Sequence, residues 1–151
     1  MQSDNELFMY KNEAYCSYAL AFVFSHTGVL SVLKATLIAP FLYTESALAK
    51  LSNSNTEIRS LEEYVAKYPS TITTLSRMYK KTLPITLNGL MLLGEMQKIR
   101  VNNGVVELIE AIPYEDDMGL YLQKAWKASP SIARILTAQE ADLYVNLRIV
   151  P

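Results

Sequence analysis

The chain has 151 residues, of which 50% are apolar and 19% are charged, and its formal net charge at pH 7 is −1. This length suits one domain with a sizeable hydrophobic core, and the near-neutral charge argues against a dedicated nucleic-acid-binding protein. Charged residues are below their usual share, so part of the surface is expected to be apolar and to meet partners. The single cysteine cannot form an internal disulfide and the chain shows no pattern typical of a secretory signal, so a cytoplasmic protein is expected.

The first part of the chain is predicted to contain two buried apolar helices. Residues 10–24 form the first, which begins near Asn12 and ends before Gly28, a residue that adopts the left-handed conformation of a helix C-terminus at low cost. Residues 30–43 form the second, and Pro40 lies near its end, where proline kinks or terminates a helix.

Part of this region is apolar enough to be compared with a membrane span. Residues 16–43 carry only His26 and Lys34 as ionisable groups and are long enough to cross a bilayer. The polar break at residues 25–28 leaves two pieces that are each too short, and the charge of Lys34 opposes insertion. We therefore expect two buried helices and no contact with a membrane.

Two further helices are expected after a loop or short helix over residues 48–58. Ser60 and Glu63 have the spacing of a capping box, in which the serine hydroxyl accepts a hydrogen bond from an amide of the first turn. This pattern predicts a helix over residues 61–67. Apolar residues at helical spacing predict another helix over residues 71–81.

Another helix is expected over residues 87–97. Thr82 and Thr86 are candidate N-caps on either side of Pro84, whose missing N–H costs little near a helix start. The apolar residues of this helix share one face, at Leu87, Leu90, Met91 and Gly94. We expect this face to pack in the core.

A β-hairpin follows this helix. Polar and apolar residues alternate over 98–101, a return strand is expected over 105–109, and Asn103-Gly104 between them is typical of a type I′ turn, which needs positive φ at both central positions. Three helices followed by a hairpin is the winged-helix plan. The expected fold is mainly α with a small β-hairpin: a winged-helix-like core flanked by extra helices.

The whole chain is expected to form a single domain over residues 1–151. Residues 1–58 would hold the N-terminal helices, residues 59–110 the winged-helix-like unit, and residues 111–151 a C-terminal helical segment. In that last segment an amphipathic helix is expected over residues 117–128.

Winged helices often bind DNA through the helix before the hairpin, so the exposed side chains of residues 87–97 decide between DNA and protein as a partner. Base edges are read by arginine, lysine, asparagine and glutamine. This helix offers Asn88, Glu95 and Gln97 but no basic residue. A winged helix adapted to bind protein is therefore favoured.

A winged-helix DNA-binding transcriptional regulator remains the alternative. Residues 58–100 contain seven basic and three acidic side chains, which gives a local excess of positive charge. A solvated surface of mixed charge is the simpler explanation, and a weak phosphate-backbone patch is the other. The candidate DNA contacts are Lys80, Lys81, Lys98 and Arg100.

The sequence contains no recognisable catalytic, cofactor or metal motif. Cys16 and His26 are the residue types of a thiol hydrolase, but ten residues on one helix place them about 15 Å apart. Their spacing does not support a zinc site, and no phosphate-binding glycine loop occurs. We expect no catalytic residue, cofactor, metal or small-molecule substrate; a hydrolase that uses Cys16 or His26 is the least favoured hypothesis.

Four short segments of the sequence, taken in order, carry a family resemblance. They are Asn-Glu-Ala-Tyr-Cys at residues 12–16, Leu-Ile-Ala-Pro-Phe-Leu at 37–42, the region 83–108 from Leu-Pro-Ile-Thr through the hairpin, and Ile-Val-Pro at 149–151. They are similar to the segments Asn-Pro-Ala-Phe-Cys, Leu-Val-Leu-Pro-Leu, Leu-x-Pro-x-Thr-x-x-Ala-Leu and Gly-Val-Arg-Pro. The chain thereby resembles the middle component of bacterial three-component ABC systems, the small subunit of Lamassu-type defence operons. It departs from the family pattern at Glu13, Ala39, Gly89 and residues 148–150.

The resemblance implies a non-catalytic adaptor. In such systems an SMC/Rad50-like ABC ATPase senses foreign DNA, and an effector, commonly a nuclease, is held in check until it is released. The middle component would bridge the ATPase subunit and the effector nuclease subunit, and it would meet DNA through the complex.

Under this hypothesis two regions are expected to contact partners, because aromatic side chains beside small residues are typical of interface hot spots. They are Asn12, Tyr15 and Tyr18 at the start of the first helix, and Pro40, Phe41 and Tyr43 at the end of the second. The alternative is that these residues pack in the core.

Overall fold

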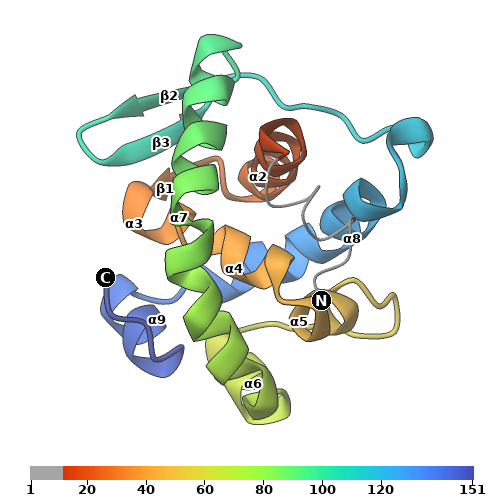
Figure 1. The fold of residues 1–151 in the computed structure, drawn as a ribbon, viewed down its shortest axis with the longest axis vertical. Helices are drawn as coiled ribbons and strands as arrows, with labels where there is room; N and C mark the ends of the chain where they lie inside the picture. Colours follow the sequence, from red (N-terminus) through yellow and green to blue (C-terminus); the bar gives the residue numbers. More distant parts are fainter. Residues whose placement is uncertain (1–11) are drawn as a thin grey trace.

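Helix α2 (Glu13–Thr27) lies at the centre of the fold in the computed structural model, which describes residues 12–151. Helices α7 (Ile72–Glu95) and α8 (Leu120–Ile135) pack against it from two sides (Figure 1). Buried residues occur on every side of α2, as expected for a helix that other helices enclose. The expectation of a mainly helical fold with a small sheet is confirmed.

Both ends of α2 are set by the residues that the sequence indicates. The Asn12 side chain caps the first turn by accepting a hydrogen bond from the Tyr15 amide at 3.0 Å. Gly28 ends the helix with φ of 70°, and its amide donates to the Phe24 carbonyl at 2.8 Å. The first residues of the predicted helix, 10 and 11, lie outside the described residues.

The prediction of one helix over residues 30–43 is wrong. A short strand, β1 (Val29–Ser31), is followed by α3 (Val32–Ala35) and α4 (Ile38–Tyr43). The Ser31 side chain accepts a hydrogen bond from the Lys34 amide at 3.1 Å, and this cap starts a new helix immediately after the strand. Pro40 lies in the first turn of α4, where it neither kinks nor ends the helix. Helix α5 (Glu45–Leu51) follows directly.

The hairpin is confirmed and belongs to a three-stranded antiparallel sheet. Strands β2 (Ile99–Asn102) and β3 (Val105–Leu108) are joined by Asn103 and Gly104, whose φ values of 53° and 74° are those of a type I′ turn. The strand order is β1-β3-β2, with Leu30 and Val101 both opposite Val106. The third strand comes from outside residues 59–110, so the sheet crosses the predicted subdivision of the chain.

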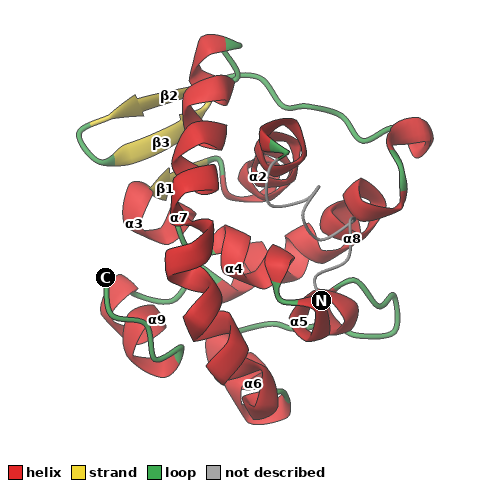
Figure 2. Ribbon diagram, in the orientation of Figure 1, coloured by secondary structure: helices red, strands yellow, loops and turns green. Residues whose placement is uncertain are grey.

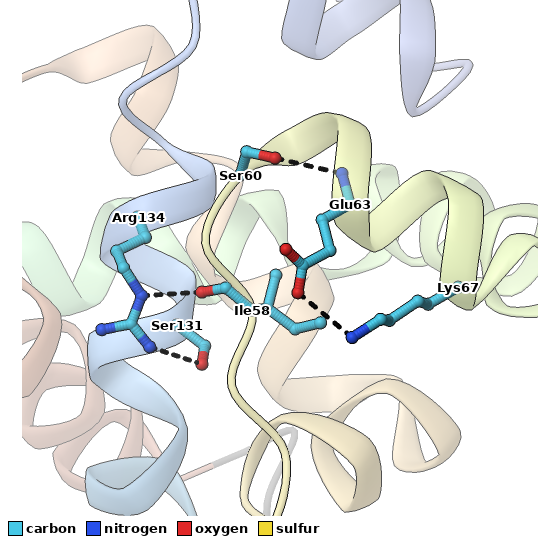
Figure 3. Close-up of polar contacts among 6 residues, drawn as sticks. All are labelled: Ile58, Ser60, Glu63, Lys67, Ser131 and Arg134. Carbon is cyan, nitrogen blue, oxygen red and sulfur yellow. Dashed lines mark hydrogen bonds and ion pairs between the residues drawn. The ribbon is translucent and has the colours of Figure 1, made fainter.

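Helix α6 (Leu61–Lys67) has the bounds that the sequence predicts. The Ser60 hydroxyl accepts a hydrogen bond from the Glu63 amide at 3.1 Å, which is the serine half of the capping box (Figure 3). The Glu63 carboxylate accepts a hydrogen bond from Lys67 at 3.2 Å along the same helix. The 3-10 helix η1 (Pro69–Thr71) then leads into α7.

The predicted break between residues 81 and 87 is absent, because α7 is one continuous helix. Thr82 is buried and donates to the Met78 carbonyl at 2.9 Å, so it is an interior residue and not an N-cap. Thr86 is also buried within the helix. Buried residues continue on both sides of Pro84, which is itself exposed, and their packing outweighs the roughly 3 kcal/mol that proline costs inside a helix. The three-helix winged-helix plan is therefore not confirmed.

The C-terminal segment crosses the molecule and ends beside α3 and α7. After β3 a long loop runs to the 3-10 helix η2 (Asp116–Met118), as Figure 2 shows, and α8 then extends past its predicted end at residue 128. Helix α9 (Glu140–Asn146) is held by Tyr144, whose hydroxyl donates to the Leu33 carbonyl at 2.9 Å and whose ring meets the edge of Tyr79. Across residues 12–151 every helix is too short or too polar to traverse a lipid bilayer.

Helices α2 and α7 approach closely at Gly89. A Cβ atom on this residue would lie 3.2 Å from Leu20 Cδ1 and 3.5 Å from Cys16 Sγ, and both of these side chains are fully buried. A Cβ atom on Gly94, further along the same helix, would meet nothing within 4 Å. The two glycines thus provide a matched pair that isolates the helix–helix contact.

We predict that Gly89→Leu destabilises the protein by about 1–3 kcal/mol, because the added side chain forces α2 and α7 apart. Gly94→Leu is expected to leave the stability unchanged or raise it by about 0.5 kcal/mol, since it only improves helix propensity. Urea unfolding followed by circular dichroism measures both. Equal stabilities of the two variants would show that α2 and α7 do not touch at Gly89.

Candidate partner-binding surface

The start of α2 forms one wall of a pocket of about 310 Å³, and the start of α8 forms the other. Asn12, Tyr15 and Tyr18 line it from α2, and Leu120 and Tyr121 from α8. The three residues predicted as the first partner-binding region are thus neighbours around a single hollow. Leu120 at its rim is 60% exposed, which makes the edge of the pocket apolar.

Tyr15 is the central aromatic residue of this pocket. Its ring makes edge-to-face contacts with Tyr43, at 5.9 Å between centroids, and with Tyr121, at 6.5 Å. Its hydroxyl is buried and has no hydrogen-bond partner among the described residues. Burial, followed by the neighbouring Cys16 and Tyr121, raises the pKa of the phenol, so it stays protonated and can donate a hydrogen bond.

The second predicted region is buried within the chain. Pro40 and Phe41 lie in the core, and the Phe41 ring contacts Tyr64 edge-to-face at 5.3 Å. Tyr43 is 8% exposed and reaches the start of α2 through Tyr15. Core packing accounts for all three residues, and contact of this region with a partner stays a prediction.

The outward face of α7 carries two exposed apolar residues that the sequence placed in the core. Leu87 is 44% exposed and Met91 is 65% exposed, whereas Leu90 between them is buried. Next to Leu87, the side-chain amide of Asn88 donates a hydrogen bond to the Glu13 carboxylate at 3.1 Å, so this part of α7 adjoins the start of α2. Because a break is predicted at Pro84, the sequence assigns the core-facing side of residues 87–97 without the preceding helical residues. The continuous helix α7 places Leu87 and Met91 on its exposed side.

The four predicted DNA contacts fall into two separate pairs. Lys98 and Arg100 on the hairpin are paired with acids, Lys98 with Glu110 at 3.0 Å and Arg100 with Glu107 at 3.7 Å. The other pair, Lys80 and Lys81, is exposed in the first half of α7. The two pairs thus lie on different elements, α7 and the hairpin region, and only the hairpin pair is neutralised by acids in the described part of the chain.

Cys16 and His26 do not form a catalytic pair. They lie near opposite ends of the continuous helix α2, about 15 Å apart along its axis. Cys16 is fully buried, and burial raises the pKa of its thiol to about 12. At neutral pH the thiol is therefore protonated and shielded from any substrate.

No family model, curated protein or solved structure matches the chain. The family resemblance of the four short segments therefore stays an expectation from the sequence.

We predict that Cys16 in the native protein is inert toward a thiol-specific reagent such as iodoacetamide at pH 8, because little thiolate is present and the sulfur is inaccessible. The same protein in denaturant should be alkylated completely, which serves as the control. Mass spectrometry after a timed reaction measures both. Rapid alkylation of the native protein would refute the buried placement of α2.

Proposed function

We propose that this protein is a non-catalytic adaptor subunit of a cytoplasmic bacterial defence complex, in which it bridges an SMC/Rad50-like ABC ATPase and an effector subunit, commonly a nuclease. The family resemblance of the sequence supplies the identity of the partners. The observation that carries the proposal is the exposed apolar pair Leu87 and Met91 on α7, on either side of Asn88, whose side chain bonds to Glu13 at the start of α2.

Binding of a partner to this surface would be driven by the unfavourable free energy of exposing apolar side chains to water. Leu87 and Met91 are large apolar side chains one helical turn apart, and they lose their contact with water when a partner covers them. Methionine adapts its shape to an apolar partner. Exposed apolar residues that lie together on one helix face are a feature of protein–protein interaction sites.

The test is co-expression with the ABC ATPase and effector encoded beside the gene, followed by affinity purification. The native protein is expected to co-purify with the ATPase. Leu87→Glu/Met91→Glu should weaken the complex at least tenfold, because two charges would be buried without partners. The control is Val145→Glu/Val150→Glu, which changes two exposed apolar residues near the C-terminus, at 75% and 76% exposure, and should leave the complex intact.

Two results would overturn the adaptor proposal. One is a gene neighbourhood without such an ATPase. The other is an ATPase complex that forms equally well with the Leu87→Glu/Met91→Glu variant while that variant is folded by circular dichroism. Equal loss in the control pair would place the interface at the C-terminal end of the chain instead.

A DNA-binding regulator is the second candidate, and Lys80 and Lys81 favour it because both are exposed without an ion pair in the described part of the chain. It predicts DNA binding that weakens steeply with salt. Lys80→Ala/Lys81→Ala should then reduce the salt dependence by about two phosphate contacts, and Lys98→Ala/Arg100→Ala should change it less, since those charges are already paired. Fluorescence anisotropy with a labelled duplex measures the slopes, and no binding at low salt excludes this function.

A further inference from the structure

A second pocket, of about 420 Å³, lies where the end of α2, the β1–α3 region and the last turns of α8 meet. Three of its lining side chains are basic: His26, Lys34 and Arg134. Thr27 and Thr137 add hydroxyl groups, and the described residues of the lining include no aspartate or glutamate. The pocket therefore concentrates positive charge in a protein whose net charge is −1.

Neutral groups hold two of these cations in place. Lys34 Nζ donates to the Leu136 carbonyl at the end of α8, at 2.8 Å. Arg134 donates through Nε to the Ile58 carbonyl at 2.7 Å and through Nη2 to the Ser131 hydroxyl at 3.2 Å. Figure 3 shows both acceptors on one side of the guanidinium, with its remaining nitrogen directed away from them. The cations are thus positioned before any ligand arrives.

The charges of Lys34 and Arg134 have no compensating anion. None of the ion pairs in residues 12–151 involves either residue, and their acceptors are a hydroxyl and backbone carbonyls. A lysine ammonium has three donors and a guanidinium five, so both retain donors for a ligand. The Thr27 hydroxyl in the same lining is buried and has no partner among the described residues. Spare donors around a cavity without acids suit an anion with several acceptor oxygens.

We propose that this pocket binds the phosphate group of a small phosphorylated ligand between His26, Lys34 and Arg134. A neighbouring pocket of about 340 Å³ shares His26 and Arg134 and is lined further by Trp126 and Lys127. Trp126 stacks on Tyr114 at 4.5 Å and is 44% exposed, which leaves aromatic surface for the organic part of a nucleotide-sized ligand. Two ligands could supply the phosphate group. Free phosphate would occupy only the first pocket, whereas a nucleoside monophosphate would also place its nucleoside in the second.

His26 provides a direct readout of the bound anion. Partial burial, followed by the nearby charge of Arg134, lowers the pKa of its imidazole. The other basic groups that share its pockets are Lys34 and Lys127. A bound dianion favours the charged imidazole and raises the pKa, so binding takes up a proton. The affinity for the anion should therefore increase as the pH falls through the pKa that His26 has in the complex. It should level off below the pKa that His26 has in the free protein.

The experiment follows the imidazole resonances of His26, the single histidine of the chain, by NMR during titration of the full-length protein with inorganic phosphate, sulfate or AMP. Sulfate keeps a constant charge over the pH range of histidine and isolates the titration of His26. We expect saturable shifts with all three anions and a raised His26 pKa in sulfate. Tighter binding of AMP than of phosphate would assign the neighbouring pocket to the nucleoside; equal binding would assign the site to free phosphate.

Three variants test the placement of the anion. Lys34→Gln and Arg134→Gln should each weaken phosphate binding about tenfold or more, since each removes a charge-assisted hydrogen bond. Lys81→Gln, which changes an exposed lysine on α7, should leave binding unchanged. Because Arg134 also holds the Ile58 carbonyl, Lys34→Gln keeps the test decisive if Arg134→Gln unfolds. Absence of saturable His26 shifts at millimolar phosphate, or equal affinity in folded Lys34→Gln and native protein, would overturn the proposal.

Discussion

The burial of the middle of α2 on every side is the constraint on which the rest of the structure depends. A helix with apolar residues on every side is stable only if other elements cover all of those sides. No charged residue occurs between positions 14 and 25, and helices α7 and α8 cover α2 over most of its length. At Gly89 the covering helix comes close enough that a Cβ atom would press on Leu20. One face of each covering helix therefore packs against α2, and the opposite face is left to contact solvent or partners.

The sheet extends this arrangement from the end of α2. Gly28 turns the chain out of the helix into β1, and its carbonyl accepts a hydrogen bond from the Leu108 amide at 2.8 Å. Strand β2 begins shortly after α7, so the hairpin joins the ends of the two helices that meet at Gly89. The basic side chains of Lys98 and Arg100 form ion pairs with Glu110 and Glu107, which lie on the return strand or just after it. The geometry of the hairpin thus supports a structural role in bracing α2 against α7.

Local signals in the sequence predicted the features that depend on a few neighbouring residues. The helix start near Asn12, the cap at Ser60, the helix end at Gly28 and the turn at Asn103-Gly104 are all present, because each is determined by hydrogen bonds or by φ within four residues. Features that depend on tertiary packing were missed. Pro84 lies inside α7 because the buried stripe continues on both sides of it, and β1 forms only because β3, far along the chain, pairs with it.

The candidate sites show the same division between local and tertiary information. Asn12, Tyr15 and Tyr18 are close in sequence and indeed share a pocket. Exposure of Leu87 and Met91 could not be read from a pattern that assumed a break at Pro84, since the break changes which side of the helix faces the core. The pocket proposed to bind phosphate combines His26 and Lys34, which are near each other in the sequence, with Arg134 from far along the chain. The packing of α8 against α2 brings Arg134 to them.

Native-state hydrogen exchange measured amide by amide tests the central position of α2 most directly. If α2 is enclosed as described, its amides over residues 17–24 exchange only when the whole molecule unfolds, with a free energy of opening equal to that of global unfolding. The amides of α6 and α9, at the periphery, should open at lower cost. Exchange of α2 that is as fast as that of α6 or α9 would contradict the account, because the helix could then leave its place without unfolding the protein.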